Sequence, residues 1–115
     1  MSKQGELLLV PFPFSDQSGR KVRPVIVVSN EDFNEFSEDV IVVGVTSNLS
    51  KNRYTLNLSN KDLEEGNLFD DYCIKVENML RLDKELVVKK IGKINKNKLK
   101  QIISKIIEIV NPKTI

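Results

Sequence analysis

The chain has 115 residues, of which 40% are hydrophobic and 30% charged, and its formal net charge is +2. This length and balance are typical of one compact domain with a modest core, and no apolar run is long enough to cross a membrane. Histidine is absent and cysteine occurs once, which excludes a Ser-His-Asp triad, a Cys-His pair, an internal disulfide and a histidine-rich zinc site. We therefore expect no metal and no cofactor, and proton transfer that relies on carboxylates, lysine, arginine or hydroxyl groups.

The charge is unevenly distributed along the chain. Residues 84–115 carry nine lysines against two glutamates, whereas residues 1–83 carry nine basic and fourteen acidic side chains. A basic C-terminal third can attract polyanions, but on charge alone a lysine-rich, solvated helix face is the more ordinary explanation. No apolar signal region follows the first four residues, and a single cysteine fits a reducing compartment. We expect a cytoplasmic protein.

Strands are expected wherever apolar and β-branched residues cluster. In chain order these segments are 6–12, 25–28, 40–46, 53–58, 72–80 and 88–94. The first segment is expected to be buried on both faces. The polar stretches between the strands predict loops at 15–21, 29–39, 47–52 and 59–71, and a single helical turn at 82–87. Phe33 and Phe36 are expected to anchor the second of these loops.

The last element is an amphipathic helix. Six apolar residues recur at helical spacing: Leu99, Ile102, Ile103, Ile106, Ile107 and Val110. Asn95 is a suitable N-cap, and the Asn111-Pro112 pair ends the helix. Many short strands followed by one helix predict a mainly-β fold, in which a small curled β-barrel carries the C-terminal helix packed on it. We expect residues 1–115 to form a single domain.

Charged and hydroxyl residues interrupt the apolar strands at their ends. Arg23 precedes the second strand, Thr46 and Ser47 end the third, and Lys75 and Glu77 share one side of the fifth. If these three strands are neighbours, the side chains gather at one rim of the barrel. Taken singly, each also has a structural interpretation, as a surface arginine, an ordinary strand end or the exposed face of an edge strand.

Such a group has a specific chemistry. Arg23 can hold a phosphate with its planar fork, and the Thr46 hydroxyl can stabilise a developing oxyanion. Glu77 can take a proton, and Lys75 can give one or stabilise the leaving oxygen. This chemistry suits attack of an RNA 2′-hydroxyl on its own phosphodiester, which needs no metal because the substrate carries the nucleophile.

Two polar loops carry further cations. Arg20 and Lys21 lie in the first loop, and Lys51 and Arg53 in or beside the loop after the third strand. They are candidates for contacts with backbone phosphates, or ordinary solubilising charges. Cys73 is expected in the core, without a redox role.

Three segments together resemble the MazF/PemK family of toxin endoribonucleases. They are "GELLLVPFPFSDQSGRKVRPVIVVSN" at 5–30, "VIVVGVTSN" at 40–48 and "VENMLRLDK" at 76–84. The resemblance implies an SH3-like barrel with a C-terminal helix, and a homodimer with an RNA groove along its interface. It implies sequence-specific, metal-independent cleavage of single-stranded mRNA that leaves a 2′,3′-cyclic phosphate and a 5′-hydroxyl. It also implies a cognate antitoxin whose C-terminal tail covers the groove.

The family's site residues carry over individually. The family's arginine falls on Arg23 and its threonine falls on Thr46. The acidic residue that some members use as general base falls on Glu77, and a basic residue two positions before it falls on Lys75. Asn78 replaces a frequent glutamine and keeps an amide for contacting RNA. The chain departs from the family in having no histidine in the first loop and in having lysine at 75, which lacks the bidentate fork of arginine.

Two other functions remain open on the sequence alone. The same barrel serves as a binding module in gyrase-targeting CcdB-type toxins, and an inactive family member would also be a binding module. A passive structural domain with a basic helix is the third possibility. The Arg23, Thr46 and Glu77 set favours the ribonuclease, because a gyrase binder does not need it.

Overall fold

The computed structural model describes residues 2–11 and 22–113 of the chain. Within them the strands are β1 (Glu6–Pro11), β2 (Val22–Val27), β3 (Asp39–Thr46), β4 (Thr55–Leu58), β5 (Leu63–Gly66), β6 (Tyr72–Asp83) and β7 (Lys89–Ile94). The helical segments are α1 (Glu31–Phe36), the 3-10 turns η1 (Asn60–Asp62) and η2 (Lys84–Leu86), and α2 (Lys96–Val110). None of the helices in these residues is long and apolar enough to cross a membrane.

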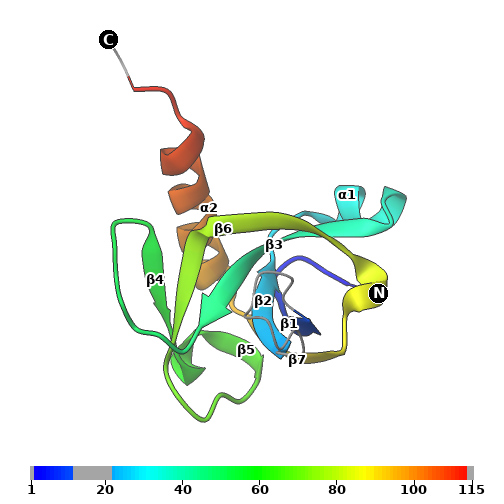
Figure 1. The fold of residues 1–115 in the computed structure, drawn as a ribbon, viewed down its shortest axis with the longest axis horizontal. Coiled ribbons are helices and arrows are strands. Elements are labelled where there is room, and N and C mark those ends of the chain that lie inside the picture. The colour runs from blue at the N-terminus through cyan, green and yellow to red at the C-terminus, as the bar shows by residue number, and fades with distance from the viewer. Residues whose placement is uncertain (1, 12–21, 114–115) are drawn as a thin grey trace.

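The strands form one antiparallel sheet in the order β4-β6-β3-β2-β1-β7-β5. The sheet curls on itself, and α2 lies against one side of it while its C-terminal half projects beyond the strands (Figure 1). Helix α1 lies on the same upper side of the barrel, to the right of α2 in this view. This architecture confirms the predicted mainly-β fold, a small curled barrel with a C-terminal helix. Strands β2, β3 and β6 are neighbours, as the site prediction requires.

The sheet is buried on both faces, because successive residues of a strand point to opposite sides. In β2, Ile26 belongs to one core, whereas Val25 and Val27 belong to the other. The first core, which includes Ile102 of α2, comprises Leu7, Ile26, Val43, Val45, Leu58, Leu68, Ile74, Val76, Ile94 and Ile102. The second core comprises Leu8, Val10, Val25, Val27, Val40, Val42 and Leu82. Burial on both faces explains why these strands read as unbroken apolar runs.

Helix α2 begins as predicted but is covered on only part of its apolar stripe. The Asn95 side chain accepts a hydrogen bond from the backbone N–H of Lys98 at 2.8 Å and so caps the first turn. Ile102 is fully buried, with Leu99 and Ile106 packed beside it. The rest of the stripe is exposed in the single chain, at Ile103, Ile107 and Val110.

The segment 29–39 is not the loop that the sequence predicts, because it contains α1. The Asn30 side chain caps this helix by accepting a hydrogen bond from the backbone N–H of Phe33 at 3.0 Å. Within it the buried Asn34 accepts the Ser29 hydroxyl and donates to the Ser29 carbonyl, which fixes the helix to the sheet. Phe33 is half-buried, but Phe36 is 85% exposed, so its expected anchoring role is wrong.

The segment 59–71 is likewise more structured than predicted. A capping box between Ser59 and Asp62 starts η1, and β5 follows it and pairs with β7. Polar composition hid this strand, since β5 is largely exposed. It ends at Gly66, where φ is +92° and a Cβ would lie 2.4 Å from the Ile91 carbonyl oxygen, so no other residue fits there without strain.

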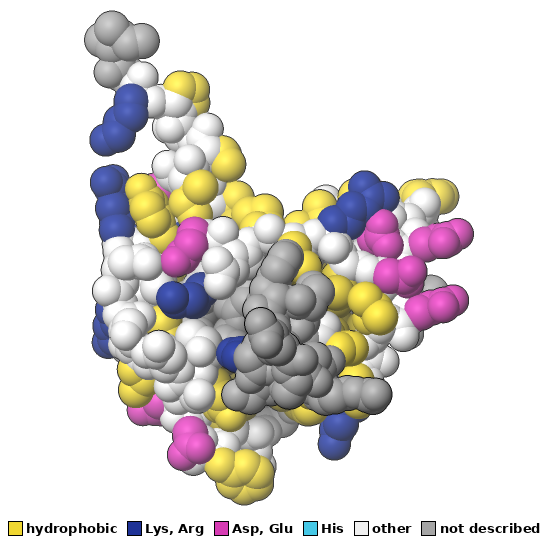
Figure 2. Space-filling view, viewed as in Figure 1, with side chains coloured by type: hydrophobic (Ala, Val, Ile, Leu, Met, Phe, Trp, Pro, Cys, Tyr) yellow, Lys and Arg dark blue, Asp and Glu magenta, His cyan; other side chains and the backbone are white. Residues whose placement is uncertain are grey.

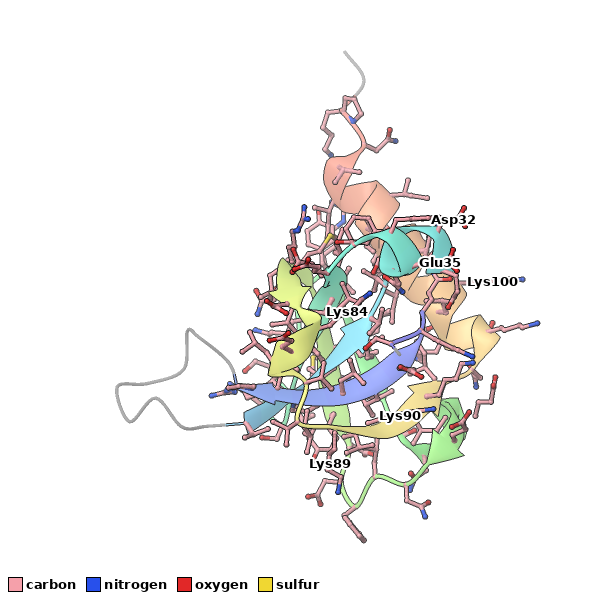
Figure 3. All side chains as sticks on the ribbon, turned by 90° about the vertical axis from the view of Figure 1, so that its right-hand side faces the viewer. Asp32, Glu35, Lys84, Lys89, Lys90 and Lys100 are labelled. Carbon is pink, nitrogen blue, oxygen red and sulfur yellow. The ribbon has the colours of Figure 1, made fainter. Side chains whose placement is uncertain are left out.

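Ion pairs of two lysines, one buried and one exposed, complete the fold. Lys98 is buried and lies 3.6 Å from the Asp62 carboxylate, which ties α2 to η1. Lys90 of β7 lies 3.0 Å from Glu65 of β5 and 3.4 Å from Glu6 of β1. The hydrogen bond with Glu65 raises the pKa of Lys90, and the same bond lowers the pKa of Glu65. Figure 3 labels Lys90 beside Lys89 on this strand.

Candidate active site

The predicted site residues continue the face of the second core. Val25 of β2 belongs to that core and is paired with Gly44 of β3. Side chains two residues apart in a strand point to the same face. Arg23 precedes Val25 by two residues and Thr46 follows Gly44 by two, so both side chains lie on this face, at the same end of the antiparallel pair. The site therefore forms where the apolar residues of this face end and polar residues begin.

Arg23 is held by a rigid strand. It is paired with Val10 of β1, and the three residues after Pro24, Val25 to Val27, are completely buried. Pro24 restricts the backbone directly beside the arginine. The Arg23 side chain is half-buried and its Nε atom has no solvent exposure. Its guanidinium is thus fixed by the fold rather than mobile in solvent.

Thr46 ends β3 and is paired with Cys73 of β6, which is buried as predicted. Its Oγ1 atom accepts a hydrogen bond from the backbone N–H of Asn48 at 3.1 Å. A hydroxyl that accepts one bond keeps its own hydrogen to donate. The turn that follows β3 therefore orients the Thr46 hydroxyl so that it can donate its hydrogen.

A bulge in β6 decides which residues face the site. Val43 is paired with Met79 and the next residue, Gly44, with Lys75, so that residues 76–78 lie between two successive pairs. Bulges change the direction of the side chains that they contain. Here Lys75 and Asn78 both line a small pocket, about 40 Å³ in volume, together with Arg23, Gly44, Val45 and Thr46.

The described lining of the pocket is rich in hydrogen-bond donors. Among residues 2–11 and 22–113 it comprises the two cations Arg23 and Lys75, the Thr46 hydroxyl and the Asn78 amide, with no carboxylate from this part of the chain. Such a set of donors is suited to an anion with several oxygens, since a guanidinium grips two of them and the other groups supply further hydrogen bonds. The pocket therefore fits a phosphate group.

Glu77 lies beside the pocket and does not line it. Its side chain is exposed, and its Oε2 atom accepts a hydrogen bond from the Asn52 side-chain amide at 3.0 Å. Val76, the residue between Lys75 and Glu77, is fully buried in the first core, as alternation predicts. The structure thus brings four predicted residues together, and it leaves the Glu77 carboxylate outside their pocket, in contact with Asn52.

The remaining predicted contacts are dispersed. Ser47 is exposed directly after Thr46. Arg53 is turned towards α2, where its Nε lies 3.7 Å from the Glu108 carboxylate, and its guanidinium is 5.5 Å from the Tyr54 ring.

Lys51 is exposed and lines a separate groove, about 650 Å³ in volume, along β4 and the start of α2. Arg20 and Lys21 lie outside the described residues. Figure 2 shows basic side chains along α2 and acidic side chains gathered over α1. Figure 3 labels two of those acidic residues, Asp32 and Glu35, on α1.

Sequence reasoning missed two residues of this region. Gly44 lines the pocket, and a Cβ there would meet the Asn78 Cβ at 3.5 Å, so its small size brings the β6 bulge close to β3. Asn52 contacts the predicted base. The place of Gly44 in the pocket is revealed only by the pairing of β3 with β6. No local signal marks Asn52, apart from the frequency of asparagine in turns.

Comparison with known proteins gives consistent matches over almost the whole chain. The sequence pattern of the PemK-like, MazF-like toxins of type II toxin–antitoxin systems matches residues 3–110. An endoribonuclease MazF of Staphylococcus saprophyticus is 27% identical over 107 residues, which cover 89% of this chain and 85% of that protein.

Solved structures agree in fold. The Mycobacterium tuberculosis toxin MazF-mt6 superposes with a TM-score of 0.74 at 14% identity, over 95% of this chain and 99% of that one. A MazE–MazF crystal structure from Deinococcus radiodurans superposes with a TM-score of 0.74 at 17% identity, over 97% of each chain.

Proposed function

Since the chain belongs to the PemK-like, MazF-like family of type II toxin–antitoxin toxins, we propose that it is an endoribonuclease that cuts single-stranded mRNA at specific sequences. The observation that carries this proposal is the pocket in which the cations Arg23 and Lys75 converge with Thr46 and Asn78 on a volume suited to one phosphate. The relative from S. saprophyticus bears the name of the same activity.

The proposed reaction is an internal transesterification of the RNA. The 2′-oxygen forms a bond to the neighbouring phosphorus, and its proton passes to Glu77. The bond from phosphorus to the 5′-oxygen breaks, and that oxygen takes up a proton. The products are a 2′,3′-cyclic phosphate and a 5′-hydroxyl, and no metal is needed because the nucleophile belongs to the substrate.

Each side chain has a defined task in this scheme. Arg23 grips two phosphate oxygens, and the Thr46 hydroxyl donates to the oxygen on which charge develops. Lys75 stands at the leaving oxygen, as proton donor or as stabilising charge. Asn78 contacts the RNA through its amide, and Ser47, Lys51 and Arg53 flank the path of the backbone, as Arg20 and Lys21 are also expected to do.

The proposed partners follow from the family and the surface. A solved relative forms a MazE–MazF complex, and another is an endoribonuclease in complex with its cognate antitoxin, so we assign this chain a cognate antitoxin too. A homodimer in the cytoplasm is proposed as the working form, with residues 1–115 as one domain. The exposed apolar stripe of α2 supports the dimer, because a second copy would cover it.

The decisive test is cleavage of a long unstructured RNA by the purified protein in EDTA, followed by sequencing of the 5′ ends of the products. We expect discrete cuts that share a sequence motif, with 5′-hydroxyl ends. Absence of cutting by a folded dimer would contradict the proposed activity. Cutting that requires added Mg²⁺ would contradict the proposed mechanism.

A further inference from the structure

The loop between β3 and β4 contains an asparagine that contacts the proposed catalytic base. We propose that Asn52 is a positioning residue, which holds one oxygen of the Glu77 carboxylate so that the other can take the 2′-hydroxyl proton. This inference rests on the proposed ribonuclease function and deepens it. It concerns a residue outside the pocket lining.

The orientation of the Asn52 amide is fixed by chemistry. Amide oxygen and nitrogen are often hard to distinguish, and the hydrogen-bond partners decide between them. The Asn52 Oδ1 accepts a hydrogen bond from the backbone N–H of Tyr54 at 2.7 Å, and an N–H can only donate. The Nδ2 group must therefore face the other way, where it donates to the Glu77 Oε2 at 3.0 Å.

The backbone of Asn52 is anchored as firmly as its side chain. Its N–H donates to the Thr55 hydroxyl oxygen at 3.1 Å, and its carbonyl accepts from the same hydroxyl at 3.0 Å. Thr55 is paired with Lys75 across β4 and β6, and the Tyr54 carbonyl accepts from the backbone N–H of Val76. Tyr54 and Thr55, the two residues that anchor Asn52, are therefore both bound to β6, the strand that carries Lys75 and Glu77.

A general base in this position needs such a restraint. Glu77 is exposed and would otherwise sample many rotamers, and ordering a glutamate side chain costs conformational entropy. A base acts efficiently only within hydrogen-bond reach of the proton that it removes. A neutral amide that binds one carboxylate oxygen orders the side chain while the second oxygen remains an acceptor.

The test compares Asn52→Asp with Asn52→Ala in the full-length protein, by steady-state cleavage of an RNA oligonucleotide that contains the cut motif. Asn52→Asp keeps the oxygen that accepts from Tyr54 and so keeps the turn, but replaces the donor with a group that repels Glu77. We expect kcat to fall about 10- to 100-fold in both variants with KM nearly unchanged, and the melting temperature of Asn52→Asp to stay close to that of the wild type. Ser50→Ala, in the same loop, serves as the control with full activity.

A double-mutant cycle links the effect to the carboxylate. If Asn52 acts through Glu77, Asn52→Asp in a Glu77→Gln background should cause no further loss of kcat. The inference is overturned if the single Asn52→Asp variant cuts RNA as fast as the wild type, or faster, since a gain would mean that the hydrogen bond from Asn52 keeps Glu77 from taking the proton. Failure of the wild type to cut at all would instead overturn the proposed function, so the two outcomes are distinguishable.

Discussion

At the scale of single residues, the site depends on groups that the backbone immobilises. Arg23 lies at the start of a strand whose next residues are buried, and its side chain is half-buried in the pocket. Arg53, by contrast, is on the surface and paired with Glu108. The two arginines have the same chemistry, and only the first is held where four polar side chains meet. Position within the fold, rather than residue type, decides their roles.

Replacing Arg23 with alanine should abolish cleavage without unfolding the protein. Loss of a fork that binds the phosphate in the transition state is expected to reduce kcat at least about 100-fold, in line with the removal of a single oxyanion donor. Arg23→Lys keeps the charge but loses the bidentate geometry, so it should recover only part of the activity.

Arg81→Ala is the matched control for this measurement, since Arg81 is paired with Asp39 outside the pocket. It removes a surface ion pair and should change cleavage rates by less than about tenfold, because exposed pairs contribute little. The melting temperature of each variant reports folding independently. An unfolded Arg23→Ala protein would mean that this arginine is structural.

At the scale of elements, the β6 bulge and the two-sided sheet determine what the strands do. The shift in register between Val43 and Gly44 turns Asn78 into the pocket. Helix α2 closes the first core with Ile102, which is fully buried. A strand or helix pattern indicates that these elements exist, but the offset between strands decides which side chains meet.

Ile102→Ala should destabilise the protein substantially. Truncating a fully buried isoleucine costs about 2–5 kcal/mol, which includes the cavity left behind. The matched control is Ile109→Ala on the same helix, where the side chain is partly exposed, and it should cost less than about 1 kcal/mol. Urea unfolding of both variants gives the two free energies, and equal losses would show that Ile102 does not close the core.

At the scale of the whole molecule, α2 leaves apolar surface uncovered. Ile107 is 55% and Val110 is 68% exposed, on the part of the helix that projects beyond the sheet (Figure 1). In Figure 2 hydrophobic side chains follow this end of the helix and border the hollow between α2 and α1. Exposed apolar surface of this kind marks an interaction face more often than a free one.

Ile107→Lys should therefore weaken the proposed dimer. A charge placed in an apolar interface must be desolvated without a partner, so the variant is expected to elute as a monomer at concentrations where the wild type is dimeric. Lys100→Glu, on the same helix, is the control and should leave the dimer intact; Figure 3 labels Lys100 projecting from α2. Sedimentation velocity measures both, and a dimeric Ile107→Lys protein would place the interface elsewhere.

The sequence by itself determined the elements with strong local signals. Unbroken apolar runs marked β1, β2 and β3, since both faces of the sheet are buried, and helical spacing with an asparagine cap marked α2. It also singled out Arg23, Thr46 and Lys75 as polar residues that interrupt the apolar strands, whereas Asn78 was singled out by the resemblance to the MazF/PemK family. Short or exposed elements such as α1 and β5 were missed, because polar composition resembles that of a loop.

Only the tertiary structure decided which of the polar residues meet. The strand order and the β6 bulge bring residues from β2, β3 and β6 into one pocket and leave Glu77 beside it, in contact with Asn52. The same packing turned Arg53 away towards α2. Long-range register has no local signature in the chain, because it is fixed by how two buried faces and a bulge fit together.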